Sequence, residues 1–236
     1  SMVEWINLLS TIYLISTFIL SFDFQRPAIY AYIISTVADI AVNKRYRNVR
    51  WDSTKWIFVV MIGLYLSIWV WHIFETCNSP RFFHSTDRRL PFVVLGLLGL
   101  FTNPNPKIKI SHITICMLIT SIAAMAYVII DNYAAIQENV GNIYDYREKI
   151  GIFRNAALEV THIEFNLYLN CTIALCLITA TKSKLLWQKI VLYAGILIIY
   201  THIITSEGRV GFITSNALLL FFICIIAYRN RSKLLI

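Results

Sequence analysis

The sequence predicts an all-α membrane protein that crosses a bilayer about eight times, with both termini in the cytoplasm. Hydrophobic residues make up 58% of the 236 residues and charged residues only 14%, whereas soluble domains carry roughly 25% charged residues. The apolar residues are also gathered into blocks, which the core of a soluble protein does not require. The chain is therefore expected to form a single transmembrane domain over residues 1–236.

The apolar blocks have the composition of membrane-spanning helices, which need about 20 residues each. The fourth block is the shortest, and it reaches the length of a span only if its helix begins earlier, near Phe83. The blocks cover residues 5–22, 28–42, 56–74, 90–101, 113–130, 162–180, 190–204 and 211–228.

The basic residues favour eight spans, because the cytoplasmic loops of membrane proteins are enriched in Lys and Arg. With eight spans, 13 of the 21 basic residues fall on one side of the membrane and 8 on the other. If residues 90–101 did not span, the Lys-rich segments 107–109, 182–189 and 229–233 would lie outside. The eight-span arrangement keeps them inside and places the long loop 131–160 outside.

The composition argues against several classes of soluble protein. The net charge of +8 is explained by the cytoplasmic loops, and no RNA- or DNA-binding pattern is present, so no nucleic-acid partner is expected. The five cysteines form no CxxC pair, so we expect neither a disulfide framework nor a metal site. The chain has no GxSxG, HExxH, Walker A or GxGxxG motif, and no cofactor is expected.

Few ionisable residues lie within the apolar blocks, where charge is costly and often functional. They are Asp39, His72, Glu164 and His202. Asp39, His72 and His202 each lie within a few residues of a span end. We therefore expect these three side chains to reach interfacial water.

The strongest local signal for a site is the polar turn Thr-Ser-Glu-Gly-Arg-Val-Gly-Phe at residues 205–212. Gly208 and Gly211 would let the backbone approach a ligand closely. Arg209 stands at the outer start of the following helix, where free N–H groups favour anions. Seven of the 8 outer basic residues are Arg, whose planar fork matches phosphate oxygens. The turn is either a phosphate site or a hairpin whose Arg is anchored to lipid headgroups.

A second signal follows Arg147 and Arg154 and reads Thr-His-Ile-Glu-Phe-Asn at residues 161–166. His162 and Glu164 lie two residues apart, so on a helix they do not share a face and are no obvious metal pair. Such polar groups at a helix start would cap the helix or hold a sugar hydroxyl.

A third signal, Asp-Arg-Arg-Leu-Pro at residues 87–91, begins the fourth block. Pro91 suits the first turn of a helix, and the charges are most simply the boundary of a span.

These three segments resemble motifs of the bacterial O-antigen ligase and O-antigen polymerase superfamily. The turn at 205–212, followed by an apolar span, is similar to the family's arginine turn. Residues 162–169 resemble the start of the preceding span, and residues 89–98 resemble the family's Leu-Pro span start. Their order and spacing match over most of the chain.

The resemblance implies a metal-independent glycosyltransferase that passes several times through the bacterial inner membrane. Such enzymes move a glycan from undecaprenyl diphosphate to a sugar hydroxyl, on lipid A–core in ligases and on the growing polysaccharide in polymerases. The catalytic residues implied here are Arg209, His162 and Glu164. The residues implied to grip the donor diphosphate are Arg209, Arg154, Arg147, Arg88 and Arg89. Arginines at this position would stabilise the leaving group electrostatically.

Members of this family are usually longer, with a second key Arg and a His in a large outer loop. The resemblance therefore implies that the chain is the N-terminal part of such a protein or a short relative. Two other functions remain open. A transporter or flippase for a lipid-linked or anionic substrate would show discontinuous spans and mid-membrane ionisable groups. A non-catalytic membrane subunit would show no clustering of the outer arginines.

Overall fold

The computed structural model describes residues 1–20, 22–49, 51–52, 55–60, 62–63, 66–67, 93–131, 133, 137, 162–205 and 209–234. These residues form helices and no strand, which confirms the predicted all-α class. The chain divides into two compact units. Unit 1 consists of Ser1–Thr11 with Pro27–Ile108, and unit 2 of Ile12–Arg26 with Lys109–Ile236. The predicted single transmembrane domain stays a prediction.

Two of the described helices are long and apolar enough to cross a membrane. They are α5 (Ile110–Asp131), with 22 residues, and α9 (Leu186–Thr205), with 20 residues. A shorter apolar stretch, Gly211–Ala227, lies within α10 (Arg209–Leu234).

The described helices do not support the predicted eight spans. Helix α1 (Met2–Thr17) has 16 residues, fewer than the roughly 20 that a span needs. Helices α2 (Phe22–Asn43) and α8 (His162–Lys182) are long enough but carry polar side chains along their length. Much of the predicted spans 56–74 and 90–101 lies outside the described residues or in short helical pieces.

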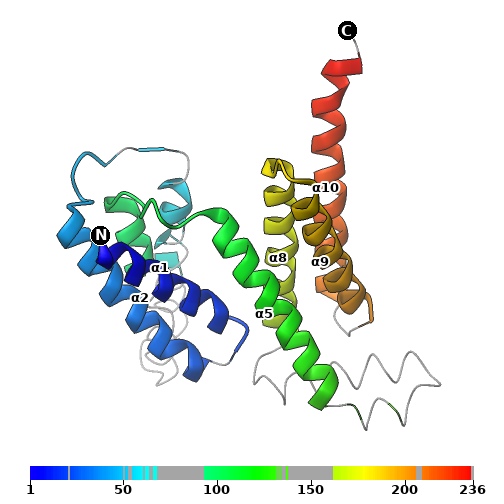
Figure 1. Cartoon of the computed structure of the whole chain (residues 1–236), viewed down its shortest axis with the longest axis horizontal. Coiled ribbons are helices and arrows are strands. Elements are labelled where there is room, and N and C mark those ends of the chain that lie inside the picture. The colour runs from blue at the N-terminus through cyan, green and yellow to red at the C-terminus, as the bar shows by residue number, and fades with distance from the viewer. Residues whose placement is uncertain are drawn as a thin grey trace. The chain divides into compact units, whose positions relative to one another are not determined.

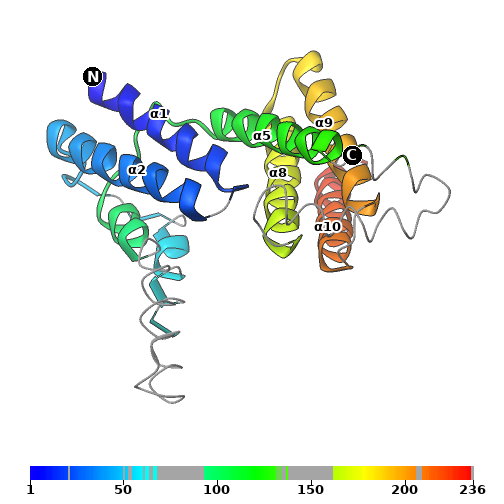
Figure 2. The ribbon, with the colours of Figure 1, turned by 90° about the horizontal axis from the view of Figure 1, so that it is seen from below.

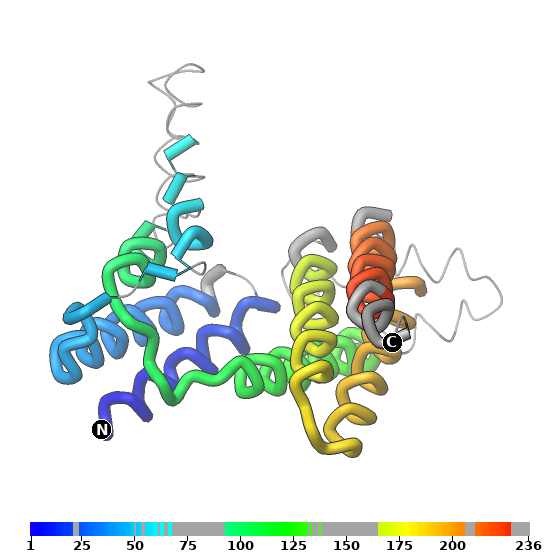
Figure 3. The backbone as a smooth tube through the Cα atoms, turned by 90° about the horizontal axis from the view of Figure 1, so that it is seen from above, coloured from blue at the N-terminus to red at the C-terminus, as the bar shows by residue number. Residues whose placement is uncertain are grey.

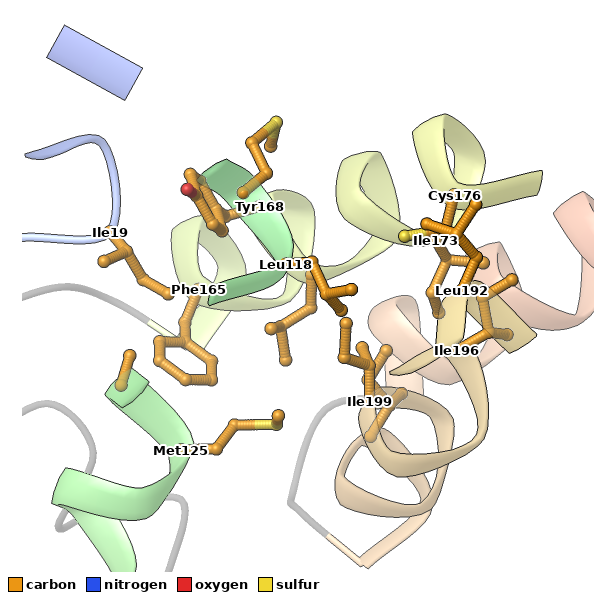
Figure 4. Packing of buried hydrophobic residues seen from close by; sticks show 14 of the residues in the cluster. Ile19, Leu118, Met125, Phe165, Tyr168, Ile173, Cys176, Leu192, Ile196 and Ile199 are labelled. Atoms are coloured by element: carbon orange, nitrogen blue, oxygen red, sulfur yellow. The ribbon is translucent and has the colours of Figure 1, made fainter. Parts of the chain in front are cut away.

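Helix α8 is the central helix of unit 2 and packs against α5, α9 and α10 (Figure 1). Phe165, Leu169, Ile173 and Cys176 recur at intervals of three or four residues, so they share one face, and all four are completely buried. Figure 4 shows this face meeting apolar side chains of α5 and α9 such as Met125.

Hydroxyl groups link α5 to α8 along their length. The hydroxyl oxygens of Thr114 and Thr179 lie 2.8 Å apart, and those of Thr120 and Tyr168 lie 2.6 Å apart. The start of α5 therefore meets the end of α8, and the two helices are antiparallel. Short polar contacts of this kind hold helices together in membranes, where lipid removes the hydrophobic drive between them.

The helix directions gather basic segments at one end of unit 2. Helix α9 follows α8 after a short connection and returns antiparallel to it (Figure 3). The first turn of α10 contacts the start of α8, so α10 runs back toward the end of α8. The start of α5, the connection 183–185 and the end of α10 thus share one end of unit 2.

Unit 1 is held by polar side chains. The N-terminal part of α1 lies beside the C-terminal part of α2 (Figure 2), where Asn7 donates hydrogen bonds to Ser35 (3.3 Å) and Thr36 (2.8 Å). Lys44, directly after helix α2, has the left-handed conformation (φ 50°), and the N–H of Arg45 donates a hydrogen bond to the carbonyl of Ile40 (3.1 Å). This is a Schellman-type cap, a role that Gly usually fills.

Buried Lys55 closes another helix end in unit 1. Its ammonium group donates hydrogen bonds to the carbonyl oxygens of Gly99 (2.6 Å) and Thr102 (2.5 Å). Gly99 lies in the last turn of the helical residues 93–101 and Thr102 directly follows them, at a helix end where a cation is favoured by the helix dipole. A lysine that the sequence placed in a cytoplasmic loop is therefore part of the packing.

Candidate functional site

Two of the sequence segments predicted to form a site lie together in unit 2. They are the start of α8 and the first turn of α10. The side-chain amide of Asn170 donates hydrogen bonds to the carbonyl of Asn166 (2.9 Å) and to that of Gly211 (3.2 Å). Asn166 and Asn170 are each 3% exposed, so this polar contact is buried between the helices.

Gly211 permits the close approach of α10 to α8. A Cβ atom added there would lie 2.7 Å from Cγ and 2.8 Å from Cβ of Asn166. The sequence analysis predicted that Gly211 lets the backbone approach a ligand closely. Its backbone instead approaches α8, since the space where a side chain would stand is filled by Asn166.

His202 lies in the last turn of α9, at the same end of unit 2. Its ring centre is 5.8 Å from that of Phe165, and the residue is 8% exposed. The expectation that His202 reaches interfacial water is wrong, because α8 covers it. Its counterpart His72 lies outside the described residues.

The predicted catalytic residues stand at the starts of two helices. His162 is the first residue of α8, Glu164 is in its first turn, and Arg209 is the first residue of α10. Their side chains lie outside the described part of the chain, so only their backbone positions are known. Both the backbone and the side chains of four further predicted residues lie outside the described part of the chain: Arg88, Arg89, Arg147 and Arg154. The predicted convergence of arginines stays a prediction.

Sequence reasoning missed the role of Asn170. Its carbonyl oxygen Oδ1 is buried and accepts no hydrogen bond from the described residues. An acceptor in this state is costly in a protein interior. The only signal in the sequence was an amide in the middle of an apolar block.

Unit 1 holds a second polar cluster, around Arg45. The guanidinium group donates to the Asp39 carboxylate (2.5 Å) and to the Glu4 carboxylate (2.6 Å). Asp39 is 2% exposed, so the expectation that it reaches water is wrong. Arg45, which lies in the turn after α2, neutralises the Asp39 carboxylate.

The hydrogen bonds and charges of this cluster shift the pKa values of Glu4 and Arg45. The amino-terminal ammonium of Ser1 donates a hydrogen bond to Glu4 (2.9 Å) and, with Arg45, lowers the pKa of Glu4 despite its partial burial. Burial opposes the charge of Arg45, but the bonds and charges of Asp39 and Glu4 outweigh it and raise the pKa of Arg45. Glu4 and Arg45 therefore stay ionised at neutral pH.

Among the residues that the structure describes, no group of three His, Cys, Asp or Glu could hold a metal ion. In comparisons with known proteins, no family model, curated protein or solved structure matches the chain.

Proposed function

We propose that this chain is a multi-pass protein of the bacterial inner membrane that binds an undecaprenyl-diphosphate-linked glycan. In this proposal the protein takes part in transferring that glycan to a sugar hydroxyl of lipid A–core or of a growing polysaccharide. The observation that carries the proposal is the meeting of the start of α8 with the first turn of α10. Both segments resemble motifs of the O-antigen ligase and polymerase superfamily, and a shared donor site requires them to be neighbours.

The membrane part of the proposal is supported by the apolar surface of unit 2. Large apolar side chains on α9 and α10 are well exposed, among them Leu197 (65%), Ile213 (65%) and Phe221 (67%). Extensive apolar surface of this kind is unfavourable in water and suits contact with lipid tails. Together with α5 and α9, which are long and apolar enough to span, it fits a membrane-embedded protein.

In this proposal Arg209 binds the donor diphosphate at the N-terminus of α10, where the helix dipole also favours an anion. Neutralising charge on the departing diphosphate would lower the barrier to transfer. His162 and Glu164, in the first turn of α8, are the neighbouring groups able to accept a proton from the acceptor hydroxyl.

The test is donor binding by purified protein in lipid, with an undecaprenyl-diphosphate-linked oligosaccharide as the probe. A hydrogen bond to a charged group contributes roughly 1.5–3 kcal/mol, so Arg209→Ala should weaken binding about tenfold to a hundredfold. Arg229→Ala, near the other end of α10, is the matched control and should bind as the wild type does. Equal affinity of wild type and Arg209→Ala would remove Arg209 from the donor site.

A further inference from the structure

The charged cluster around Arg45 is internally balanced. Arg45 and the Ser1 ammonium face two carboxylates, those of Glu4 and Asp39. The cluster therefore adds no net charge to the surface of unit 1. Any excess charge there comes from residues outside it.

Among the described residues, three surface cations outside the cluster supply that excess, and we call them the basic rim. They are Lys44, Arg47 and Lys107, of which the first two are exposed and the third is half-buried. None of them forms an ion pair with a described acid. Asp52 is the one described acid of unit 1 outside the Arg45 cluster, so the rim outnumbers it.

Hydrogen bonds tie the segments of the basic rim into one surface. The side-chain amide of Asn103 donates to the carbonyls of Arg45 (3.2 Å) and Arg47 (3.0 Å), which fixes the turn after α2. Asn105 donates to the carbonyl of Glu4 (3.0 Å) and accepts from the N–H of Lys107 (2.9 Å). The turn, the start of α1 and the loop 103–107 are thus held together.

Exposed aromatic rings accompany these cations. Trp5 is 54% exposed, Tyr46 54% and Trp51 60%. The ammonium of Lys107 stands 5.2 Å from the centre of the Trp5 ring, a cation–π distance. Trp and Tyr next to Lys and Arg make up the composition that proteins place at the headgroup level of a bilayer.

We propose that the basic rim with Trp5, Tyr46 and Trp51 binds the headgroups of anionic phospholipids. The cations pair with lipid phosphates, and the aromatic rings lie among the glycerol groups below them. Anionic headgroups supply the counter-charge that the balanced Arg45 cluster cannot. This surface uses none of the residues assigned to the donor diphosphate, so it is a separate property of the protein.

The experiment measures lipid binding to the full chain in neutral detergent, by native mass spectrometry and by the shift in melting temperature. The probes are phosphatidylglycerol, phosphatidylcholine and inorganic phosphate. The test variant is K44Q/R47Q/K107Q. The matched control, K182Q/K184Q/K189Q, removes the same charge from unit 2, and K44R/R47K/K107R keeps the charge of the rim.

The wild type should retain phosphatidylglycerol in preference to phosphatidylcholine and should melt at a higher temperature with it. Each neutralised rim residue should weaken that binding about fivefold, which corresponds to about 1 kcal/mol for a basic residue at an anionic surface. The unit 2 control and the charge-keeping variant should behave as the wild type. The melting temperature in phosphatidylcholine should be unchanged in all variants, since the altered side chains lie outside the core.

Three results would overturn the proposal, and two of them concern the retention of phosphatidylglycerol. One is equal retention of phosphatidylglycerol by the wild type and by K44Q/R47Q/K107Q. The other is an equal loss in the unit 2 control, which would mean that total charge matters and the rim does not. Stabilisation of the wild type by inorganic phosphate alone would likewise reject a lipid surface in favour of an anion site.

Discussion

The two units of this protein are stabilised by different chemistry. In unit 1 the buried groups that decide the packing are polar: Asn7, Asp39 and Lys55 each find partners on another segment. In unit 2 a stripe of apolar side chains on α8 forms the centre, and hydroxyl pairs only supplement it. The difference implies that unit 1 depends on complete pairing, whereas unit 2 depends on complementary shape.

Removing the charge partner in unit 1 should have the largest effect. Arg45→Ala leaves Asp39 buried beside no cation, and breaking a buried pair in this way costs about 3–5 kcal/mol. The free energy of unfolding in detergent, from denaturant titration, measures the loss. Arg47→Ala is the control, since its exposed side chain should contribute under about 0.5 kcal/mol. Equal losses in the two variants would show that the Arg45 pairing is not what stabilises unit 1.

Shortening a core side chain of α8 should have the next largest effect. Leu169 is completely buried, and Leu→Ala changes in cores cost about 2–5 kcal/mol. If the protein lies in a membrane as proposed, the lower end of that range applies, because lipid would solvate an apolar side chain and only the packing part would be lost. Leu197→Ala, on the exposed face of α9, should leave the melting temperature unchanged. A larger loss for Leu197 than for Leu169 would contradict a core centred on α8.

Adding one methyl group to Gly211 tests shape complementarity directly. The new Cβ would meet three atoms of Asn166 within 2.8 Å, and overpacking of this kind costs about 1–3 kcal/mol. At Gly195 the nearest atoms are the branch ends of Leu118, which can rotate away, so Gly195→Ala should cost less.

Gly63 is the control position for the substitutions at Gly211 and Gly195. An added Cβ there meets nothing within 4 Å, so Gly63→Ala should be neutral or stabilising by about 0.5–1 kcal/mol. Melting temperatures should therefore fall in the order Gly63→Ala, Gly195→Ala, Gly211→Ala. A different order would mean that α10 is not packed on α8 as described.

Acid should weaken unit 1, by the smallest of these effects. The pKa of Glu4 is lowered from its usual 4.5, so its contribution to stability is present above that value and is lost as the pH falls through the lowered pKa. Thermal unfolding between about pH 5 and pH 2 measures this loss, in the range where such carboxylates titrate. Glu4→Gln should remove part of the pH dependence, and an unchanged acid profile would exclude Glu4 as a contributor.

The sequence anticipated the general character of both units but not how their polar residues are used. Hydrophobic blocks predicted helices, because a chain in lipid must satisfy its backbone hydrogen bonds internally. The predicted number of spans, in contrast, is not supported by the described helices. Block length and loop charge predicted eight spans, whereas the polar side chains of α2 and α8 make those helices less apolar than α5, which is long and apolar enough to cross a membrane.

The motifs around the candidate site were recognisable in the sequence, since glycine, arginine and a polar helix start are local features. Their meeting was not predictable, because it depends on α10 folding back along α8 so that Gly211 reaches Asn170. Asp39 shows the same limit. Its position near a helix end suggested access to water, and only the turn after α2 brings Arg45 over it.

What the sequence by itself determined is the helical class and the apolar character of the chain. These follow from composition and periodicity, which act residue by residue. The tertiary structure alone decided which polar groups are buried, which glycine is needed for close packing, and which described cations of unit 1 form no ion pair with a described acid. Those properties depend on what lies opposite each side chain, and long-range contacts between helices set them.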